Sequence, residues 1–173
     1  MLRAALLLSL TACATAPVPE TALMPEARFD GYATIAYAGQ RESPDGFERF
    51  QLNEEQREVA VDAARTALTE QGWTVLPPAQ VGDADVLVRV GIGARMNETR
   101  TVVTADPRLG SAAVIDLDVR DGAMVVACFD AESGALLWTG QLVQERASEG
   151  SLATLRRNVT ALFRAIPPPG GED

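Results

Sequence analysis

The stretch 113–143 constrains the fold most, because apolar residues alternate with polar or small ones along much of it. At its centre, Asp121 and Gly122 form a dipeptide typical of two-residue β-hairpin turns. With the turn at this dipeptide, Ile115 would face Cys128 on one side of the sheet. The stretch therefore predicts an antiparallel hairpin with one apolar face.

A second turn is expected at residues 130–134, where Gly134 follows polar residues. This turn would bring Leu136 beside Cys128 and Trp138 beside Val126, again on the apolar face. The turn and alternation signals agree with each other, which predicts a well-specified register.

Two helices flank the strands. Asn53 with Gln56 three residues later is typical of a capping box, and Gly72 is a stop signal, so a helix is predicted over residues 54–71. Ser151 is expected to cap a second helix, which a run of three prolines ends. Apolar stripes should face the sheet, and they comprise Ala60, Val61, Ala64, Ala67 and Leu68 in the first helix and Leu152, Leu155, Val159, Leu162 and Phe163 in the second.

Other strands are predicted at residues 29–37, 73–76 and 86–92, with a weaker one at 100–104 and a turn or loop at 106–110. The order is strand, helix, four or five strands, helix. This order predicts an α+β fold with a single antiparallel sheet of about five or six strands and two helices packed on one face.

The N-terminus predicts a lipoprotein signal peptide over residues 1–12, with one positive charge before a short apolar segment. That segment is too short to cross a bilayer, which needs roughly 20 residues. Leu10-Thr11-Ala12-Cys13 resembles the bacterial lipobox, a resemblance that implies acylation of Cys13. Ordinary secretory cleavage after Ala16 is the alternative, but Pro17 is a poor neighbour for it.

Two or more acyl chains hold a protein stably on a membrane. Residue 14 is Ala rather than Asp, which by resemblance to Gram-negative lipoproteins favours the outer membrane, facing the periplasm. Residues 13–28 contain three prolines and are expected to form a tether. Residues 29–168 would be a single α+β domain and 169–173 a disordered tail.

Composition excludes several functions. The sequence has no histidine, which removes Ser–His and Cys–His nucleophilic pairs and every His-ligated metal site. The net charge of -9 argues against a nucleic-acid partner. If Cys13 is acylated, Cys128 has no disulfide partner and is expected to be buried. We therefore expect no catalytic residue, no metal site and no cofactor.

Two motifs resemble known sites but lack residues that those sites require. Asp116, Asp118 and Asp121 suggest a calcium loop, but the glycine comes one place too late and the distal Glu is missing, so a solvated strand face is favoured. The Gly91-Ile92-Gly93 run lacks the third glycine of a dinucleotide loop and lies within a predicted strand.

Residues 125–130 and 134–140, which contain a Leu-Trp-Thr-Gly run, resemble small bacterial lipoproteins of domain of unknown function 4136. Residues 32–37 and the Ile166-Pro167 pair also resemble that family, so the likeness covers about 29–168. The resemblance implies an α+β fold and an envelope location, and it implies no known catalytic residue.

Two functions follow as hypotheses. The first is a non-catalytic, lipid-anchored periplasmic envelope protein that binds or scaffolds a partner, through an exposed sheet edge. The second is a lipid- or small-molecule-binding accessory lipoprotein of an envelope transport system, with an apolar pocket between helices and sheet. A cavity lined by Val61, Leu68, Trp138 and Leu155 would favour the second, while a filled core with an open strand edge would favour the first.

Overall fold

The computed structural model of the protein describes residues 17–106, 111–147 and 151–170. Cys13 lies outside the described residues. In chain order the elements are β1 (Glu20–Leu23), β2 (Thr34–Gln40), β3 (Glu48–Arg49), α1 (Glu54–Glu70), β4 (Thr74–Leu76), the 3-10 helix η1 (Pro78–Asp83), β5 (Val86–Asp106), β6 (Ser111–Asp130), β7 (Leu136–Ala147) and α2 (Leu152–Arg164).

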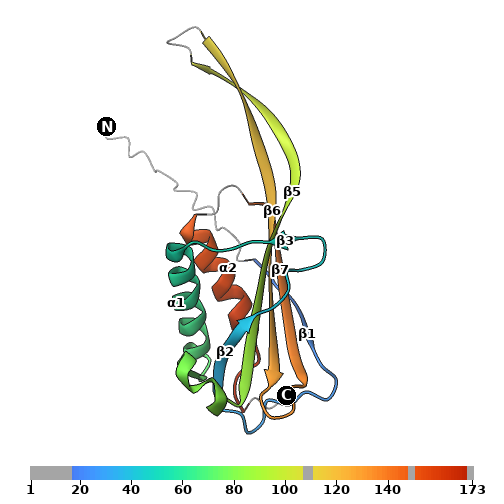
Figure 1. The fold of residues 1–173 in the computed structure, drawn as a ribbon, viewed down its shortest axis with the longest axis vertical. Helices are drawn as coiled ribbons and strands as arrows, with labels where there is room; N and C mark the ends of the chain where they lie inside the picture. Colours follow the sequence, from blue (N-terminus) through green and yellow to red (C-terminus); the bar gives the residue numbers. More distant parts are fainter. Residues whose placement is uncertain (1–16, 107–110, 148–150, 171–173) are drawn as a thin grey trace, which may run out of the picture.

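The domain has two layers, with α1 and α2 side by side on one face of a single sheet (Figure 1). The strand order is β1-β7-β6-β5-β2-β4, and β3 pairs with β5. At one end, β5 and β6 extend beyond the other elements as a long two-stranded hairpin (Figure 1). The α+β class and the placement of both helices on one face are therefore confirmed.

The prediction of an antiparallel sheet of five or six strands is wrong in two respects. The sheet has seven strands, and it is mixed, because β2 pairs in parallel with both β4 and β5. A parallel pair requires a long crossover connection. Helix α1 supplies that crossover between β2 and β4, so the strand–helix–strand order should have predicted a parallel pair.

The predicted turn at Asp121-Gly122 is also wrong. Both residues lie inside β6, and the chain reverses between Asp106 and Ser111, which pair with each other. Asp121 pairs with Arg95 of β5, and its buried carboxylate lies 3.2 Å from the Arg95 guanidinium. A charge partner across the strand explains how an aspartate occupies the middle of a strand at a position where the sequence indicated a turn.

The second hairpin has the predicted turn but a different register. Strand β6 ends at Asp130 and β7 begins at Leu136, yet Trp138 pairs with Cys128 rather than Val126. An irregularity between Cys128 and Phe129 accounts for the difference. Because the register error is two residues, Trp138 stays on the expected face, where it is 2% exposed.

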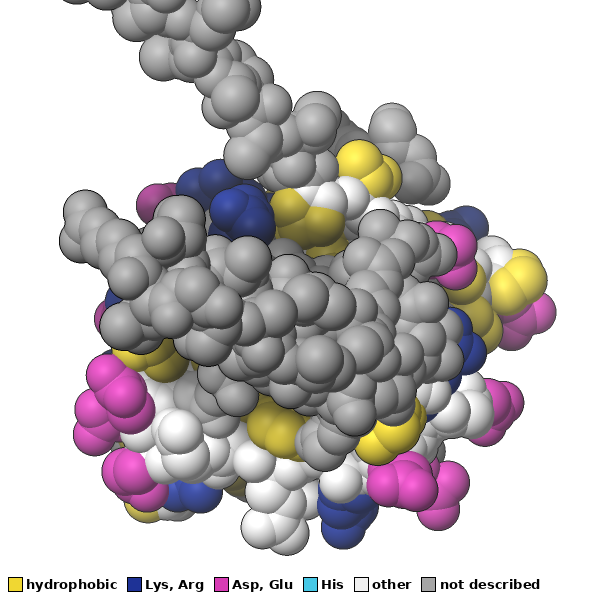
Figure 2. All heavy atoms as spheres, turned by 90° about the horizontal axis from the view of Figure 1, so that it is seen from above, with side chains coloured by type: hydrophobic (Ala, Val, Ile, Leu, Met, Phe, Trp, Pro, Cys, Tyr) yellow, Lys and Arg dark blue, Asp and Glu magenta, His cyan; other side chains and the backbone are white. Residues whose placement is uncertain are grey.

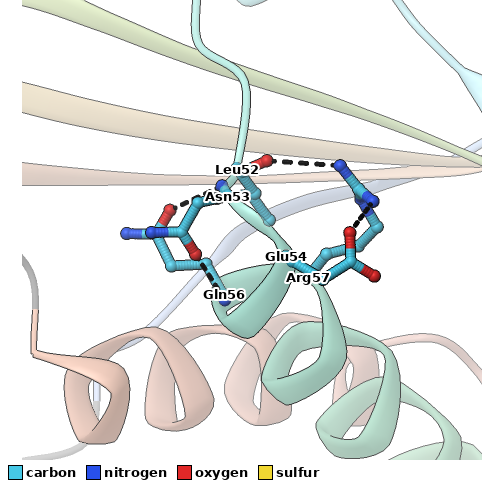
Figure 3. Close-up of polar contacts among 5 residues, drawn as sticks. All are labelled: Leu52, Asn53, Glu54, Gln56 and Arg57. Atoms are coloured by element: carbon cyan, nitrogen blue, oxygen red, sulfur yellow. Dashed lines mark hydrogen bonds and ion pairs between the residues drawn. The ribbon is translucent and has the colours of Figure 1, made fainter.

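Both helix starts are confirmed. The Asn53 side chain accepts a hydrogen bond from the Gln56 backbone N–H at 2.9 Å, and the Gln56 side chain accepts one from the Asn53 N–H at 3.0 Å (Figure 3). Gly72 follows α1 with a φ of 96°, a conformation that favours glycine. The Ser151 hydroxyl caps α2 by accepting from the Thr154 N–H at 3.2 Å.

Part of the expected tether belongs to the sheet. Within 13–28, residues Glu20–Leu23 form β1, which pairs antiparallel with β7. All four residues of β1 are exposed. The sheet therefore begins before residue 29, where the domain was expected to start.

The glycines of the rejected dinucleotide motif have a packing role. The segment between β2 and β3 crosses the sheet at this point, so a Cβ at Gly91 would lie 2.2 Å from the Glu42 carbonyl oxygen. A Cβ at Gly93 would lie 2.6 Å from the Phe47 Cβ. The Arg95 guanidinium lies over the Phe47 ring at 4.7 Å, which fixes the same segment.

Candidate functional site

A cavity of about 440 Å³ lies between α1 and the sheet. On the sheet side it is lined by Ile35 of β2 and Val88 of β5, and on the helix side by Ala60 and Ala64 of α1. Small-molecule pockets usually measure roughly 300–1,000 Å³. The cavity is therefore large enough for a small apolar ligand.

Small side chains on α1 explain the open space. At Ala60 and Ala64 the helix presents only methyl groups to the sheet, and both residues are partly buried. Val61 was expected in the inner stripe, but it is 53% exposed and lines the cavity. Of the four residues named in the cavity hypothesis, Val61 and Leu68 line it, whereas Trp138 and Leu155 do not.

Exposed hydrophobic side chains gather at this cavity. Among the residues whose exposure the structure describes, seven large hydrophobic side chains are exposed. Three of the seven, Tyr37, Phe50 and Val61, line the cavity. Exposed apolar surface that borders a cavity is typical of a ligand-binding groove.

Charged side chains are distributed unevenly around the cavity. Arg41, Arg49, Arg57 and Arg65 line the cavity, and no Asp or Glu of the described residues does. The chain as a whole carries 24 acidic and 15 basic residues. Figure 2, seen from the end where the hairpin projects, shows one group of basic side chains beside hydrophobic ones at the upper left and further basic side chains elsewhere around the domain. The cavity is thus a positively charged site on an acidic protein.

The four arginines differ in their partners. Arg57 forms an ion pair with Glu54 at 2.7 Å and donates to the Leu52 carbonyl oxygen at 3.4 Å, next to the capping box (Figure 3). The Nη1 nitrogen of Arg41 is buried and has no hydrogen-bond partner among the described residues. A buried charged donor without an acceptor is rare in native proteins and calls for an explanation.

Cys128 is fully buried, as expected. Desolvation raises the pKa of its thiol to about 12, which keeps the thiol neutral and unreactive near neutral pH. The side chains of Asp116 and Asp118 lie outside the described part of the structure. Within the described part, no group of three Cys, Asp or Glu residues is placed to hold a metal ion.

Two aspartates at the opposite end of the sheet from the hairpin have structural partners. Asp85 accepts hydrogen bonds from the Ala33 N–H at 2.9 Å and from the Thr34 N–H and hydroxyl at 2.8 and 2.7 Å. These bonds, with the Ala33 bond the largest cause, lower the pKa of Asp85 and fasten β2 to the start of β5.

Asp130 closes the turn between β6 and β7. It accepts hydrogen bonds from the Ser133 hydroxyl and N–H and from the Tyr32 hydroxyl, and these lower the pKa of its carboxyl. The hydrogen bond from the Tyr32 hydroxyl to Asp130 is the largest cause that raises the pKa of Tyr32 to about 12. Glu132 lies exposed in the same turn.

In the part of the chain that the structure describes, neither helix is long and apolar enough to cross a membrane.

Comparison with known proteins identifies the family. The family model for a domain of unknown function (DUF4136) matches residues 19–168, and the chain belongs to this family. The resemblance noted in the sequence is thereby confirmed. No curated protein matches the sequence.

Several solved structures have a similar fold. A PDZ domain protein from Parabacteroides distasonis matches with 14% identity and a TM-score of 0.51, over 85% of this chain and 34% of that protein. The chain thus spans about a third of that protein, and the likeness concerns the fold alone. A DUF4136 family protein from Bacteroides thetaiotaomicron matches with 11% identity and a TM-score of 0.49, over 85% of this chain and 94% of the other.

The lipoprotein GNA1162 from Neisseria meningitidis is a third match, with 14% identity and a TM-score of 0.37. It covers 71% of this chain and 92% of the other.

Proposed function

We propose that this protein is a non-catalytic, lipid-anchored envelope protein whose domain binds a lipid or another apolar small molecule in the cavity under α1. The observation that carries the proposal is the cavity itself, which is about 440 Å³ in volume. Ile35 and Val88 line it on the sheet side, and Ala60 and Ala64 line it on the helix side. Exposed Tyr37, Phe50 and Val61 border the same space, as expected for a groove that receives an apolar ligand. An accessory role in an envelope transport system would suit such a site.

A scaffold that binds an envelope protein is the second candidate. The observation in its favour is β1, whose four exposed residues form one edge of the sheet. Exposed strand edges can pair with a strand of another chain. Photocrosslinking from Ala22 in intact envelopes should capture a specific partner if β1 is a docking edge, and crosslinks to the bulk of abundant proteins would contradict it.

The anchor is proposed to be acylated Cys13, holding the domain on the periplasmic face of the outer membrane. Membrane-extracted protein should carry the mass of two or three acyl chains, and Cys13→Ser should remove them, because serine lacks the acylated sulfur. An unacylated N-terminus beginning at Pro17 in the unaltered protein would contradict the anchor.

Ligand binding is tested with Nile red, a neutral apolar fluorophore, titrated into the full chain. Ala64→Phe places a ring in the cavity and should weaken Nile red binding by about tenfold or more, since the ring occupies the volume of the probe. Ala153→Phe is the matched control, because Ala153 is exposed on α2 and does not line the cavity. Equal affinity of both variants and the unaltered protein would contradict the proposal.

A further inference from the structure

We propose that the ligand of this cavity is a single-chain amphiphile with an anionic oxygen head, a carboxylate or a phosphate monoester. Its tail would lie between α1 and the sheet, and its head would be bound by arginine, with Arg41 as the principal contact. The inference rests on the proposed ligand-binding function and specifies the ligand class.

The first argument is the charge of the lining. Four of the chain's fifteen basic residues line the cavity, and no acidic residue of the described part does, although acidic residues outnumber basic ones in the whole chain. A neutral ligand would gain no net Coulomb attraction from this positive lining. An anion gains Coulomb attraction that is strengthened where apolar walls exclude water.

The second argument is the unsatisfied donor of Arg41. The backbone N–H of Arg41 donates to the Val90 carbonyl oxygen at 2.9 Å, so the sheet fixes where this residue leaves β2. Its Nη1 nitrogen is nonetheless buried without an acceptor among the described residues. A carboxylate or phosphate oxygen would satisfy the guanidinium with charge-assisted, bidentate hydrogen bonds.

The other three arginines have secondary roles. Arg57 already has Glu54 and the Leu52 carbonyl oxygen as partners, so it is less available to a ligand than Arg41. Arg49 and Arg65 have no ion-pair partner among the described residues and add to the positive potential at the cavity. The site therefore combines one unsatisfied buried donor with a wider positive lining.

The apolar part of the site specifies the tail. Ile35, Val88 and Val90 from two neighbouring strands line the cavity, opposite the alanines of α1. The side chains of this part of the lining are all apolar, which suits a hydrocarbon chain better than a sugar or a nucleotide. Polar groups of the ligand would be confined to its arginine-bound end.

The test compares three ligands of equal chain length, namely dodecanoate, dodecyl phosphate and dodecanol, by displacement of Nile red from the full chain. Both anions should bind about tenfold more tightly than dodecanol, as expected for one charge-assisted interaction in a largely desolvated site. Arg41→Gln should abolish this preference, because it removes the charge that binds the anionic head. The ratio between the two anions identifies which head the site prefers.

Arg157→Gln is the matched control, because it removes one positive charge from the exposed face of α2 and Arg157 does not line the cavity. It should keep the anion preference. If Arg41→Gln has a lowered urea midpoint, Arg65→Gln replaces it, with a smaller loss of preference expected.

Equal binding of dodecanol and the anions, or an anion preference that survives Arg41→Gln, would overturn this inference while leaving the proposed cavity function intact. Failure of all three ligands and of Nile red to bind would overturn both.

Discussion

The two helices cover the same face of the sheet, yet the space beneath them differs. Under α2 the core is filled, since Leu162 and Val159 are at most 1% exposed and pack in one cluster with Trp138. Under α1 the alanines at positions 60 and 64 leave a cavity. Val159 and Phe163 of α2 line that cavity and so form the wall between the two regions.

The difference shows that side-chain size determines which part of the core is filled and which part has room for a ligand. Large side chains that fill the space under α2 exclude voids and stabilise the domain. Small side chains under α1 give up part of that stabilisation and leave room for a ligand. Substitutions under α2 should therefore change stability, and substitutions under α1 should change binding.

The largest effect is expected for Trp138→Ala. Trp138 is 2% exposed in the filled region, so truncation removes buried apolar surface and leaves a cavity. Such substitutions usually cost about 3–5 kcal/mol of unfolding free energy, out of about 5–15 for a domain. Urea denaturation followed by circular dichroism, for Trp138→Ala and the unaltered protein, measures the loss. A loss under about 1 kcal/mol would show that this region is not densely packed.

Gly140→Ala should come next. A Cβ at Gly140 would lie 2.3 Å from the Trp138 ring, so the ring or the strand must move, at a cost of about 1–3 kcal/mol. Gly82→Ala is the control, because no atom lies within 4 Å of its would-be Cβ. The same urea measurement should show Gly82→Ala unchanged or slightly stabilised. Equal midpoints for the two variants would contradict close packing at Gly140.

The helix caps separate stability from binding. Asn53→Ala and Ser151→Ala each remove a side-chain cap and should each cost about 1 kcal/mol. Asn53 caps the N-terminal end of α1, and the first turn of this helix borders the cavity at Arg57. Loss of the cap should loosen this turn and so also weaken Nile red binding. Ser151→Ala should leave that binding unchanged, and a comparable weakening by both variants would remove the distinction between the two helices.

Acidification should have the smallest effect on stability. The folded-state pKa of Asp85 lies below its unfolded value of about 4. Its contribution is therefore present above about pH 4 and is lost as the pH falls through the folded pKa. The unfolding free energies of the parent and Asp85→Asn, measured by urea denaturation, should differ by less than about 1 kcal/mol at neutral pH and converge towards pH 2. A pH-independent gap for Asp85→Asn would contradict the hydrogen bonds to its carboxylate.

Local signals in the sequence predicted the helices well, because caps and stops act within a few residues. The capping box at Asn53 and the stop at Gly72 gave the extent of α1 within one residue. The Asp121-Gly122 signal failed because its partner, Arg95, is 26 positions away in the sequence. A local turn signal contains no information about such a long-range ion pair.

The candidate site was predicted only in part. Val61 and Leu68 were correctly associated with a cavity, but no periodicity indicates that a helix of small residues leaves a void rather than packing closely. The lining arginines come from the residue after β2, from β3 and from α1, so their grouping depends on the parallel pairing of β2, which the sequence did not predict. Arginine residues spaced eight apart on α1, at 57 and 65, were the one local signal available.

The most direct test of the empty space under α1 is a pair of identical substitutions on that helix, Ala64→Leu and Ala67→Leu, compared by urea denaturation. Ala64 lines the cavity, whereas Ala67 is fully buried in the core. Leucine at position 64 should leave the unfolding free energy unchanged or raised, because it fills empty space, while leucine at 67 should lower it by about 1–3 kcal/mol through overpacking. Equal destabilisation by both substitutions would show that the space under α1 is filled, and would contradict the presence of a cavity there.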